Sequence, residues 1–175
     1  MIDVNRSKVL EDTSLFVLDM DGTFYLEDMI LDGSLYFLEQ VKRTGKDFLF
    51  FTNNSSRSPK DYLVKLDRMN CIIDKRQIMT SGDVMIEFLN TYYLGKRVYL
   101  LGTPELENSF TNNGILLSDE YPEVVVAAFD TTLTYKKLEQ ACDFIRGGAA
   151  FLATHPDLNC PTRKGFIPDC GAICA

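Results

Sequence analysis

Two aspartates separated by one residue, Asp19 and Asp21, follow the short apolar run 15–18 and are the side chains best suited to chemistry in this sequence. Carboxylates at positions i and i+2 beyond a buried strand can point to one side, where one binds a cation or attacks while the other transfers protons. Gly22 lets the backbone turn sharply, and Thr23 adds a hydroxyl and a backbone N–H. Because adjacent carboxylates would repel a phosphate unless a divalent cation neutralised them, and hard oxygen ligands favour Mg²⁺, the pair predicts Mg²⁺-assisted phosphoryl transfer.

Two other local structures also combine aspartate with glycine, and each is an alternative to a phosphoryl-transfer site. One is an isolated acidic turn after a strand, because Asp and Gly are common turn residues. The other is a calcium-binding EF-hand loop, which needs Gly at its sixth position and Glu at its twelfth. Phe24 and Ile30 occupy those positions here, and an apolar strand-like run rather than a helix precedes Asp19. The pattern therefore favours phosphoryl transfer over calcium binding.

A second polar cluster, residues 52–56, follows another apolar run at residues 48–51. The spacing of apolar residues predicts a helix over residues 35–45 and another from Pro59 onward. Alternating strands and helices indicate a parallel sheet, in which ligands bind at the carboxyl ends of the strands. The two aspartates and the second polar cluster should therefore converge on one crevice.

The alternation continues beyond residue 81 and predicts an α/β fold with a Rossmann-like parallel sheet. We place a module boundary near residues 81–83, which divides the chain into residues 1–81 and 82–175. Three prolines and two glycines in residues 154–175 predict a long ordered loop there. The other elements expected in the second module are helices over 84–94, 104–112 and 133–145 and strands over 97–101, 124–129 and 151–153.

The composition excludes several classes of protein. The 175 residues are 46% hydrophobic and 25% charged, as in ordinary globular domains. A net charge of -7 argues against nucleic-acid binding, and no apolar run approaches the ~20 residues of a membrane span. The polar N-terminus lacks a secretion signal, and five cysteines without a Cys-x-x-Cys pair argue against a disulfide framework. We expect a cytoplasmic protein with reduced thiols and neither nucleic-acid nor membrane partners.

The two polar clusters together resemble the first and second motifs of phosphatases in the haloacid dehalogenase superfamily. The first is Asp19-Met20-Asp21-Gly22-Thr23, and the second is Phe51-Thr52-Asn53-Asn54-Ser55-Ser56-Arg57-Ser58, in a form similar to the NagD-like, 4-nitrophenylphosphatase branch. The resemblance extends through residues 154–157 and 165–171, which look like the substrate-facing loop of that branch's α/β cap domain. It implies that residues 1–81 form the N-terminal half of the core and residues 82–175 the cap.

The resemblance also assigns roles. It implies that Asp19 is the nucleophile that forms an aspartyl-phosphate, and that Asp21 protonates the leaving oxygen and then activates water. Asp19 would also be a ligand of Mg²⁺, and the backbone carbonyl of Asp21 would help to hold it. Thr52, Asn53 and the backbone near Gly22 would bind the phosphoryl group of a small phosphorylated metabolite. Strand capping is the structural alternative for Thr52 and Asn53.

The chain departs from the family pattern at its C-terminal end. The third motif, a lysine, and the fourth, an acidic Gly-Asp segment, should follow the cap, and Lys164 in the loop is a poor substitute. We therefore expect a fragment or a truncation with an apolar strand edge left unpaired beside Asp19. The rival interpretation is a catalytically silent scaffold that acts as a homodimer through the cap or the sheet edge. A phosphomutase or a phosphoacceptor with the same aspartyl-phosphate chemistry is a third possibility, but the large second module favours a capped hydrolase.

One further candidate region is the segment around the single histidine, His155. With three nearby cysteines it matches no zinc-binding spacing. In the cap loop His155 and Asp157 could contact the leaving group of the substrate, and Asp157 is the better candidate because the resemblance reaches it. A plain Pro-Asp turn is the alternative.

Overall fold

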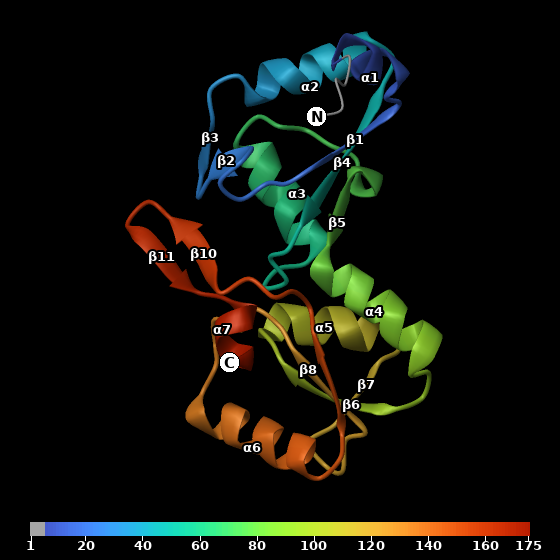
Figure 1. Cartoon of the computed structure of the whole chain (residues 1–175), viewed down its shortest axis with the longest axis vertical. Coiled ribbons are helices and arrows are strands. Elements are labelled where there is room, and N and C mark those ends of the chain that lie inside the picture. The colour runs from blue at the N-terminus through green and yellow to red at the C-terminus, as the bar shows by residue number, and fades with distance from the viewer. Residues whose placement is uncertain (1–5) are drawn as a thin grey trace.

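The computed structural model describes residues 6–175, which form two parallel β-sheets with helices packed against them. Figure 1 shows the sheets in opposite halves of an elongated molecule. The helices are α1 (Arg6–Asp12), α2 (Ser34–Arg43), α3 (Pro59–Arg68), the 3-10 helix η1 (Lys75–Gln77), α4 (Ser81–Tyr92), α5 (Pro104–Asn112), α6 (Tyr135–Arg146) and α7 (Cys170–Cys174). The strands are β1 (Leu15–Leu18), β2 (Tyr25–Leu26), β3 (Met29–Ile30), β4 (Asp47–Thr52), β5 (Ile78–Thr80), β6 (Arg97–Leu101), β7 (Leu116–Leu117), β8 (Val124–Ala127), β9 (Ala150–Ala153), β10 (Asn159–Thr162) and β11 (Gly165–Pro168).

The first sheet has the order β1-β4-β5, with all strands parallel. Parallel neighbours need a crossover, and α2 and α3 provide it. Helix α3 begins with a capping box in which the Asp61 N–H donates to the Ser58 hydroxyl at 3.4 Å and the Ser58 N–H donates to an Asp61 carboxylate oxygen at 3.0 Å, and Pro59 occupies its first turn. The buried side of α3, Tyr62 and Leu66, packs in one core with Phe48 and Phe50 of β4. This core fixes the ends of β1 and β4 relative to each other.

The second sheet has the order β7-β6-β8-β9, again parallel. Its central strand β8 is buried along its whole length because helices cover both faces. Val124 and Val126 face a core with α4 and α5, whereas Val125 and Ala127 face a second core with α6 and α7. Because successive side chains of β8 point to opposite faces of the sheet, this one strand packs against two helices on each face.

The α/β fold class predicted from the sequence is confirmed, and the strands and helices expected over residues 15–145 are present with shifted ends. The long loop predicted for residues 154–175 is wrong. This segment contains an antiparallel hairpin, in which Asn159 pairs with Pro168 and Thr162 with Gly165, followed by α7. Both edges of a two-stranded ribbon tolerate proline, so the prolines that suggested a loop are compatible with strands. Gly165, with φ 124°, allows the tight turn between them.

Strand β1 lies at an edge of its sheet and, among the described residues, pairs with β4 alone. Its Leu15 and Val17 side chains are 48% and 61% exposed. An apolar sheet edge of this kind is the feature expected beside Asp19. None of the helices within residues 6–175 combines the length and the hydropathy needed to cross a membrane.

We predict that Leu66→Ala destabilises the protein by about 2–5 kcal/mol, because it leaves a cavity under the sheet that carries the two polar clusters. Leu66 is fully buried, whereas Leu94 is 78% exposed, so Leu94→Ala is a matched control that should change the free energy of unfolding by less than about 0.5 kcal/mol. Urea denaturation followed by circular dichroism measures both. Equal effects of the two substitutions would contradict this assignment of the core.

Candidate active site

The turn that follows β1 separates the two aspartates. The backbone N–H groups of Thr23, Phe24 and Tyr25 all donate to the carbonyl of Met20, whose side chain is fully buried. Gly22, with φ 83°, donates its N–H to the carbonyl of Tyr25 at 2.7 Å. A side chain at Gly22 would be strained in this conformation. The chain therefore turns tightly around Met20, the residue between the two aspartates.

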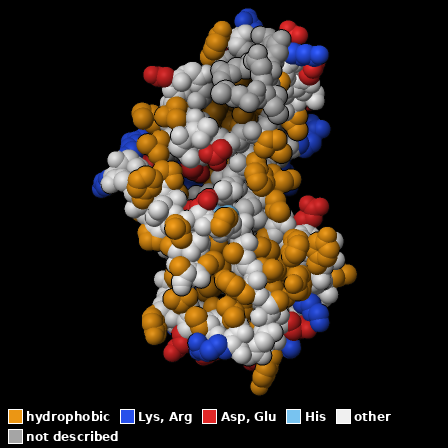
Figure 2. All heavy atoms as spheres, viewed as in Figure 1, with side chains coloured by type: hydrophobic (Ala, Val, Ile, Leu, Met, Phe, Trp, Pro, Cys, Tyr) orange, Lys and Arg blue, Asp and Glu red, His pale blue; other side chains and the backbone are white. Residues whose placement is uncertain are grey.

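Asp21 lines a cavity of about 660 Å³ between the first sheet and the β10–β11 hairpin. The Tyr25 hydroxyl donates to an Asp21 oxygen at 3.4 Å. Burial raises the pKa of the Asp21 carboxyl, the positive charge of Lys65 opposes that rise, and Asp19 adds to it. Figure 2 shows acidic side chains in the hollow at the middle of this face.

Asp19 lines a separate, smaller hollow together with Thr23 and Phe24. Its Oδ2 atom accepts a hydrogen bond of 2.9 Å from the Thr23 hydroxyl, and the side chain is exposed. The two aspartates thus line different hollows, while Asp19 lies near enough for its charge to raise the pKa of Asp21. Thr52, Asn53 and Asp157 also lie outside the residues that line the larger cavity.

The second polar cluster faces the C-terminal part of the chain. The amide nitrogen of the Asn53 side chain donates to Asp157 Oδ2 at 2.7 Å across 104 residues of sequence. Thr52 is buried, and its hydroxyl accepts from the backbone N–H of Asn54 at 3.1 Å, which is the capping role named above as its alternative. Of the expected site residues, Asn53 and Asp157 are in direct contact, whereas Asp19, Asp21 and Thr52 share only the same end of the sheet.

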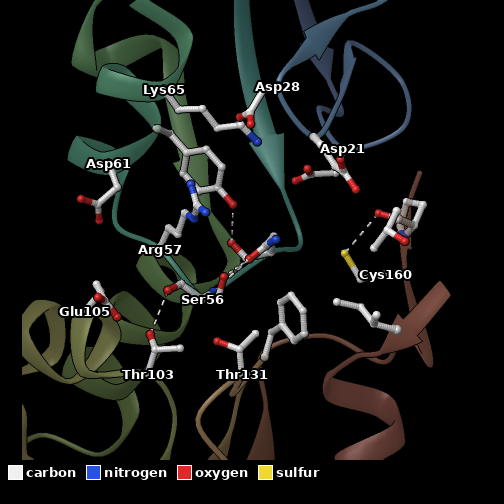
Figure 3. A pocket seen from close by; sticks show the side chains of 17 residues that line it. Asp21, Asp28, Ser56, Arg57, Asp61, Lys65, Thr103, Glu105, Thr131 and Cys160 are labelled. Carbon is white, nitrogen blue, oxygen red and sulfur yellow. Dashed lines mark hydrogen bonds between the residues drawn. The ribbon is translucent and has the colours of Figure 1, made fainter. Parts of the chain in front are cut away.

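Sequence reasoning missed two cations that line the cavity, Arg57 and Lys65 (Figure 3). Lys65 reaches from α3 toward Asp28 and Asp21, and its Nζ atom lies 3.9 Å from the centroid of the Tyr25 ring. Burial lowers the pKa of the Lys65 ammonium, and Asp21 opposes that change. Arg57 was part of the second motif, whereas no pattern in the sequence marked Lys65, whose position follows from the packing of α3 beside Tyr25.

Several acidic residues of the cavity wall already have partners. Glu27 forms an ion pair with Arg163 at 3.2 Å, and Asp61 accepts from the backbone and hydroxyl of Ser58. These carboxylates therefore serve to hold the cavity wall together. Arg57 and Lys65 are then positioned to meet an anion that enters beside Asp21.

Comparison with known proteins identifies the family. The model of the haloacid dehalogenase-like hydrolases matches residues 16–116, more than half of the chain. The chain belongs to this family. Its sequence is 34% identical over 159 residues to an acid sugar phosphatase of Staphylococcus saprophyticus, a match that covers 90% of this chain and 61% of that relative.

Solved structures agree with this assignment. A 4-nitrophenylphosphatase from Thermotoga maritima superposes with a TM-score of 0.90 and 47% identity, and the match covers 94% of this chain and 63% of that one. A putative NagD protein gives a TM-score of 0.88 and 46% identity over 92% of this chain and 64% of that one. The predicted resemblance to the NagD-like branch is confirmed. The chain spans about three fifths of the length of these haloacid dehalogenase-like relatives.

The donor set at the end of β1 fits a hard divalent cation. Mg²⁺ commonly binds one or two carboxylates and completes its coordination with water and substrate phosphate. Asp19 offers one such carboxylate and Asp21 a backbone carbonyl, and within residues 6–175 no group of three or more acidic, histidine or cysteine side chains gathers as a complete metal site. His155 is buried and bonded to Asp169 at 2.8 Å, away from any such cluster in the described part of the chain. The side chains present therefore fit a partial Mg²⁺ site rather than a zinc site.

The environment of Cys160 gives a test of the cavity. Burial, together with the nearby charges of Asp21 and Asp169, raises the pKa of the Cys160 thiol to about 11. Since the thiolate is the reactive form, iodoacetamide should label Cys160 at pH 8 at least about tenfold more slowly in the folded protein than in urea. Peptide mass spectrometry measures both rates for the same residue, and the folded-state rate should rise steadily up to pH 10. Equal rates at pH 8 in the two states would show that Cys160 is not held in this environment.

Proposed function

We propose that the protein is a Mg²⁺-dependent phosphatase that hydrolyses small phosphate monoesters through an aspartyl-phosphate. The observation that carries the proposal is the Asp19–Asp21 pair at the carboxyl end of β1, with one carboxylate exposed and the other half-buried beside two cations. The phosphatases among the relatives support it. In such sheets ligands bind at this end of the strands.

In the proposed reaction Asp19 attacks phosphorus while the Thr23 hydroxyl holds its Oδ2 atom, which leaves Oδ1 to form the new bond. The raised pKa of Asp21 keeps a proton on this carboxyl to a higher pH, and that proton passes to the leaving oxygen. Asp21 then accepts a proton from the water that hydrolyses the aspartyl-phosphate. Bound Mg²⁺ would offset the charge of the phosphoryl group and of the two carboxylates.

The positions of the other predicted residues extend the proposal. Gly22 and Asn53, with Thr52 behind them, would supply donors or support at the phosphoryl group, and Asp157 would approach from the second module. We retain residues 1–81 as the half-core and 82–175 as the cap, with residues 154–171 as the substrate-facing segment. Contacts such as the one from Asn53 to Asp157 support this division because they join the two parts at the site.

The cavity supports a small substrate. Its volume of about 660 Å³ is within the usual range for small-molecule sites, and the acid sugar phosphatase relative makes a sugar phosphate a reasonable class. The net charge of -7 argues against a nucleic acid as substrate. All five cysteines are free, which fits the proposed cytoplasmic location.

The proposal predicts that Asp19→Asn lowers the Mg²⁺-dependent hydrolysis of 4-nitrophenyl phosphate at least about a hundredfold, because an amide cannot act as the nucleophile. Asp67→Asn on the exposed surface of α3 is the matched control and should retain activity. Removal of Mg²⁺ with EDTA should have the same effect as Asp19→Asn, and added Mg²⁺ should reverse it.

Two outcomes of this assay have different meanings. Equal activity of the wild type and Asp19→Asn would exclude Asp19 as the nucleophile. Lack of activity in both, with the proteins folded, would favour the catalytically silent scaffold, whose homodimer would then be sought by size-exclusion chromatography with light scattering.

The cations of the cavity give a separate prediction. Arg57→Met should raise KM for a phosphate monoester about ten- to a hundredfold with kcat nearly unchanged, because a charge-assisted hydrogen bond to a bound anion contributes about 1.5–3 kcal/mol. Arg68→Met, at the exposed end of α3, removes the same charge elsewhere and should leave KM unchanged. A matching rise in KM in both variants would mean that overall charge, rather than a contact in the cavity, controls binding.

A further inference from the structure

A chain of hydrogen bonds links the turn after β4 to the C-terminal hairpin through Ser55, Thr154, His155 and Asp169. Ser55 Oγ lies 3.2 Å from Thr154 Oγ1, and Thr154 Oγ1 lies 2.9 Å from His155 Nδ1. His155 Nε2 lies 2.8 Å from Asp169 Oδ1. Ser55 has no exposed surface, and His155 and Asp169 are each 5% exposed. Thr154 between them is partly buried, so these hydrogen bonds lie largely inside the molecule.

The hydrogen bonds between these residues can all run in one direction, with each group donating to the next. The backbone N–H of Phe129 donates to Ser55 Oγ at 2.9 Å, so the Ser55 hydroxyl is free to donate to Thr154. Thr154 then donates to Nδ1 of His155, and the Nε2–H group donates to Asp169. In this assignment His155 is the Nε2–H tautomer, and the Thr154 hydroxyl also lies 3.7 Å from Cys170 Sγ, a second acceptor. Each buried hydroxyl or ring N–H then has an acceptor.

Asp169, the last member of this hydrogen-bond chain, supports the turn that carries Asp157. Asp169 caps α7 through a hydrogen bond of 2.7 Å from the backbone N–H of Cys170, and its own N–H donates to the carbonyl of Leu158. The N–H of Gly171 donates to the carbonyl of Asp157 at 2.8 Å. A Cβ atom at Gly171 would lie 2.1 Å from the carbonyl oxygen of Pro156, so only glycine permits this approach. The backbone of residues 156–158 is thus held against the start of α7.

We propose that Thr154, His155 and Asp169 are positioning residues that hold the Asp157 carboxylate on Asn53, and so fix the distance between the second polar cluster and the β10–β11 hairpin. None of the three touches the proposed reacting atoms. The contact that they maintain is the Asn53–Asp157 hydrogen bond of 2.7 Å. The inference rests on the proposed function only in treating Asp157 as part of a substrate site, because the contact itself can be observed without substrate.

The physical reason is the cost of leaving buried polar atoms unpaired. Thr154→Val keeps the shape of the side chain but removes its hydroxyl, which leaves the Ser55 hydroxyl proton without an acceptor and the Nδ1 atom of His155 without a donor. The structure can restore their pairing only by admitting water or by moving the segment that contains His155. Either change would shift the neighbouring Asp157 away from Asn53.

Nuclear magnetic resonance of the Asn53 side-chain amide tests this in the full chain. The two amide proton signals are identified by their loss in Asn53→Asp, and Asp157→Ala gives their positions when the contact is absent. In Thr154→Val they should move most of the way to the Asp157→Ala positions, whereas in Thr154→Ser, which keeps the hydroxyl, they should stay at the wild-type positions. Wild-type signals in a folded Thr154→Val protein would overturn the proposal.

A second pair of variants alters Asp169, at the other end of the hydrogen-bond chain. Asp169→Ala removes the acceptor for His155 and should shift the Asn53 signals, and Asp169→Asn keeps an acceptor oxygen and should not. If Thr154→Val and Asp169→Ala both fail to fold while Thr154→Ser and Asp169→Asn fold, these hydrogen bonds stabilise the whole fold and the positioning role is overturned. If the signals move as expected but the protein has no phosphatase activity, the positioning stands and only the proposed function fails. If activity depends on Asp19 but the signals do not move, the proposed function stands and the positioning role fails.

Discussion

The arrangement of the two sheets depends on buried hydrogen bonds between the turn after β4 and the carboxyl ends of the second sheet. Ser55 accepts from the backbone of Phe129, and the carbonyl of Ser56 accepts from the Thr103 hydroxyl at 2.8 Å (Figure 3). These groups are removed from water, so each must have a partner or cost about 1–3 kcal/mol. Satisfying them places the carboxyl ends of the strands in the two sheets opposite each other, which is where the cavity lies.

Facing the strand ends toward each other also sets the electrostatics of the cavity. The second sheet and its hairpin cover Asp21 enough for burial to raise the pKa of its carboxyl, and Asp21 in turn opposes the loss of charge on Lys65. Arg57 lies on the same wall. A half-buried carboxyl beside two cations can hold or release a proton as an anion binds, which is the property required of a general acid and base.

The sequence was sufficient for the parts of the structure that depend on local pattern. The apolar runs before Asp19 and Thr52 predicted adjacent parallel strands, because a buried strand and its polar end can be recognised within ten residues. It was insufficient where distant segments meet. The contact of Asn53 with Asp157 depends on the packing of one sheet against the other, and the place of Lys65 beside Asp21 depends on the packing of α3 against the first sheet. Pro161 and Pro168 misled because the local pattern does not show that they lie in a two-stranded ribbon, where each strand has a free edge that tolerates proline.

Spacing along the chain was also an incomplete guide to the two aspartates. An i, i+2 pair in a continuing strand would point to one side, but the chain leaves the strand and turns around the buried side chain of Met20. Asp19 is therefore exposed and held by Thr23, whereas Asp21 is half-buried and held by Tyr25. A nucleophile and a general acid need different surroundings, since one carboxyl must attack while the other keeps a proton. The turn at Met20, rather than the spacing of the motif, creates that difference and so carries the strongest structural support for unequal roles.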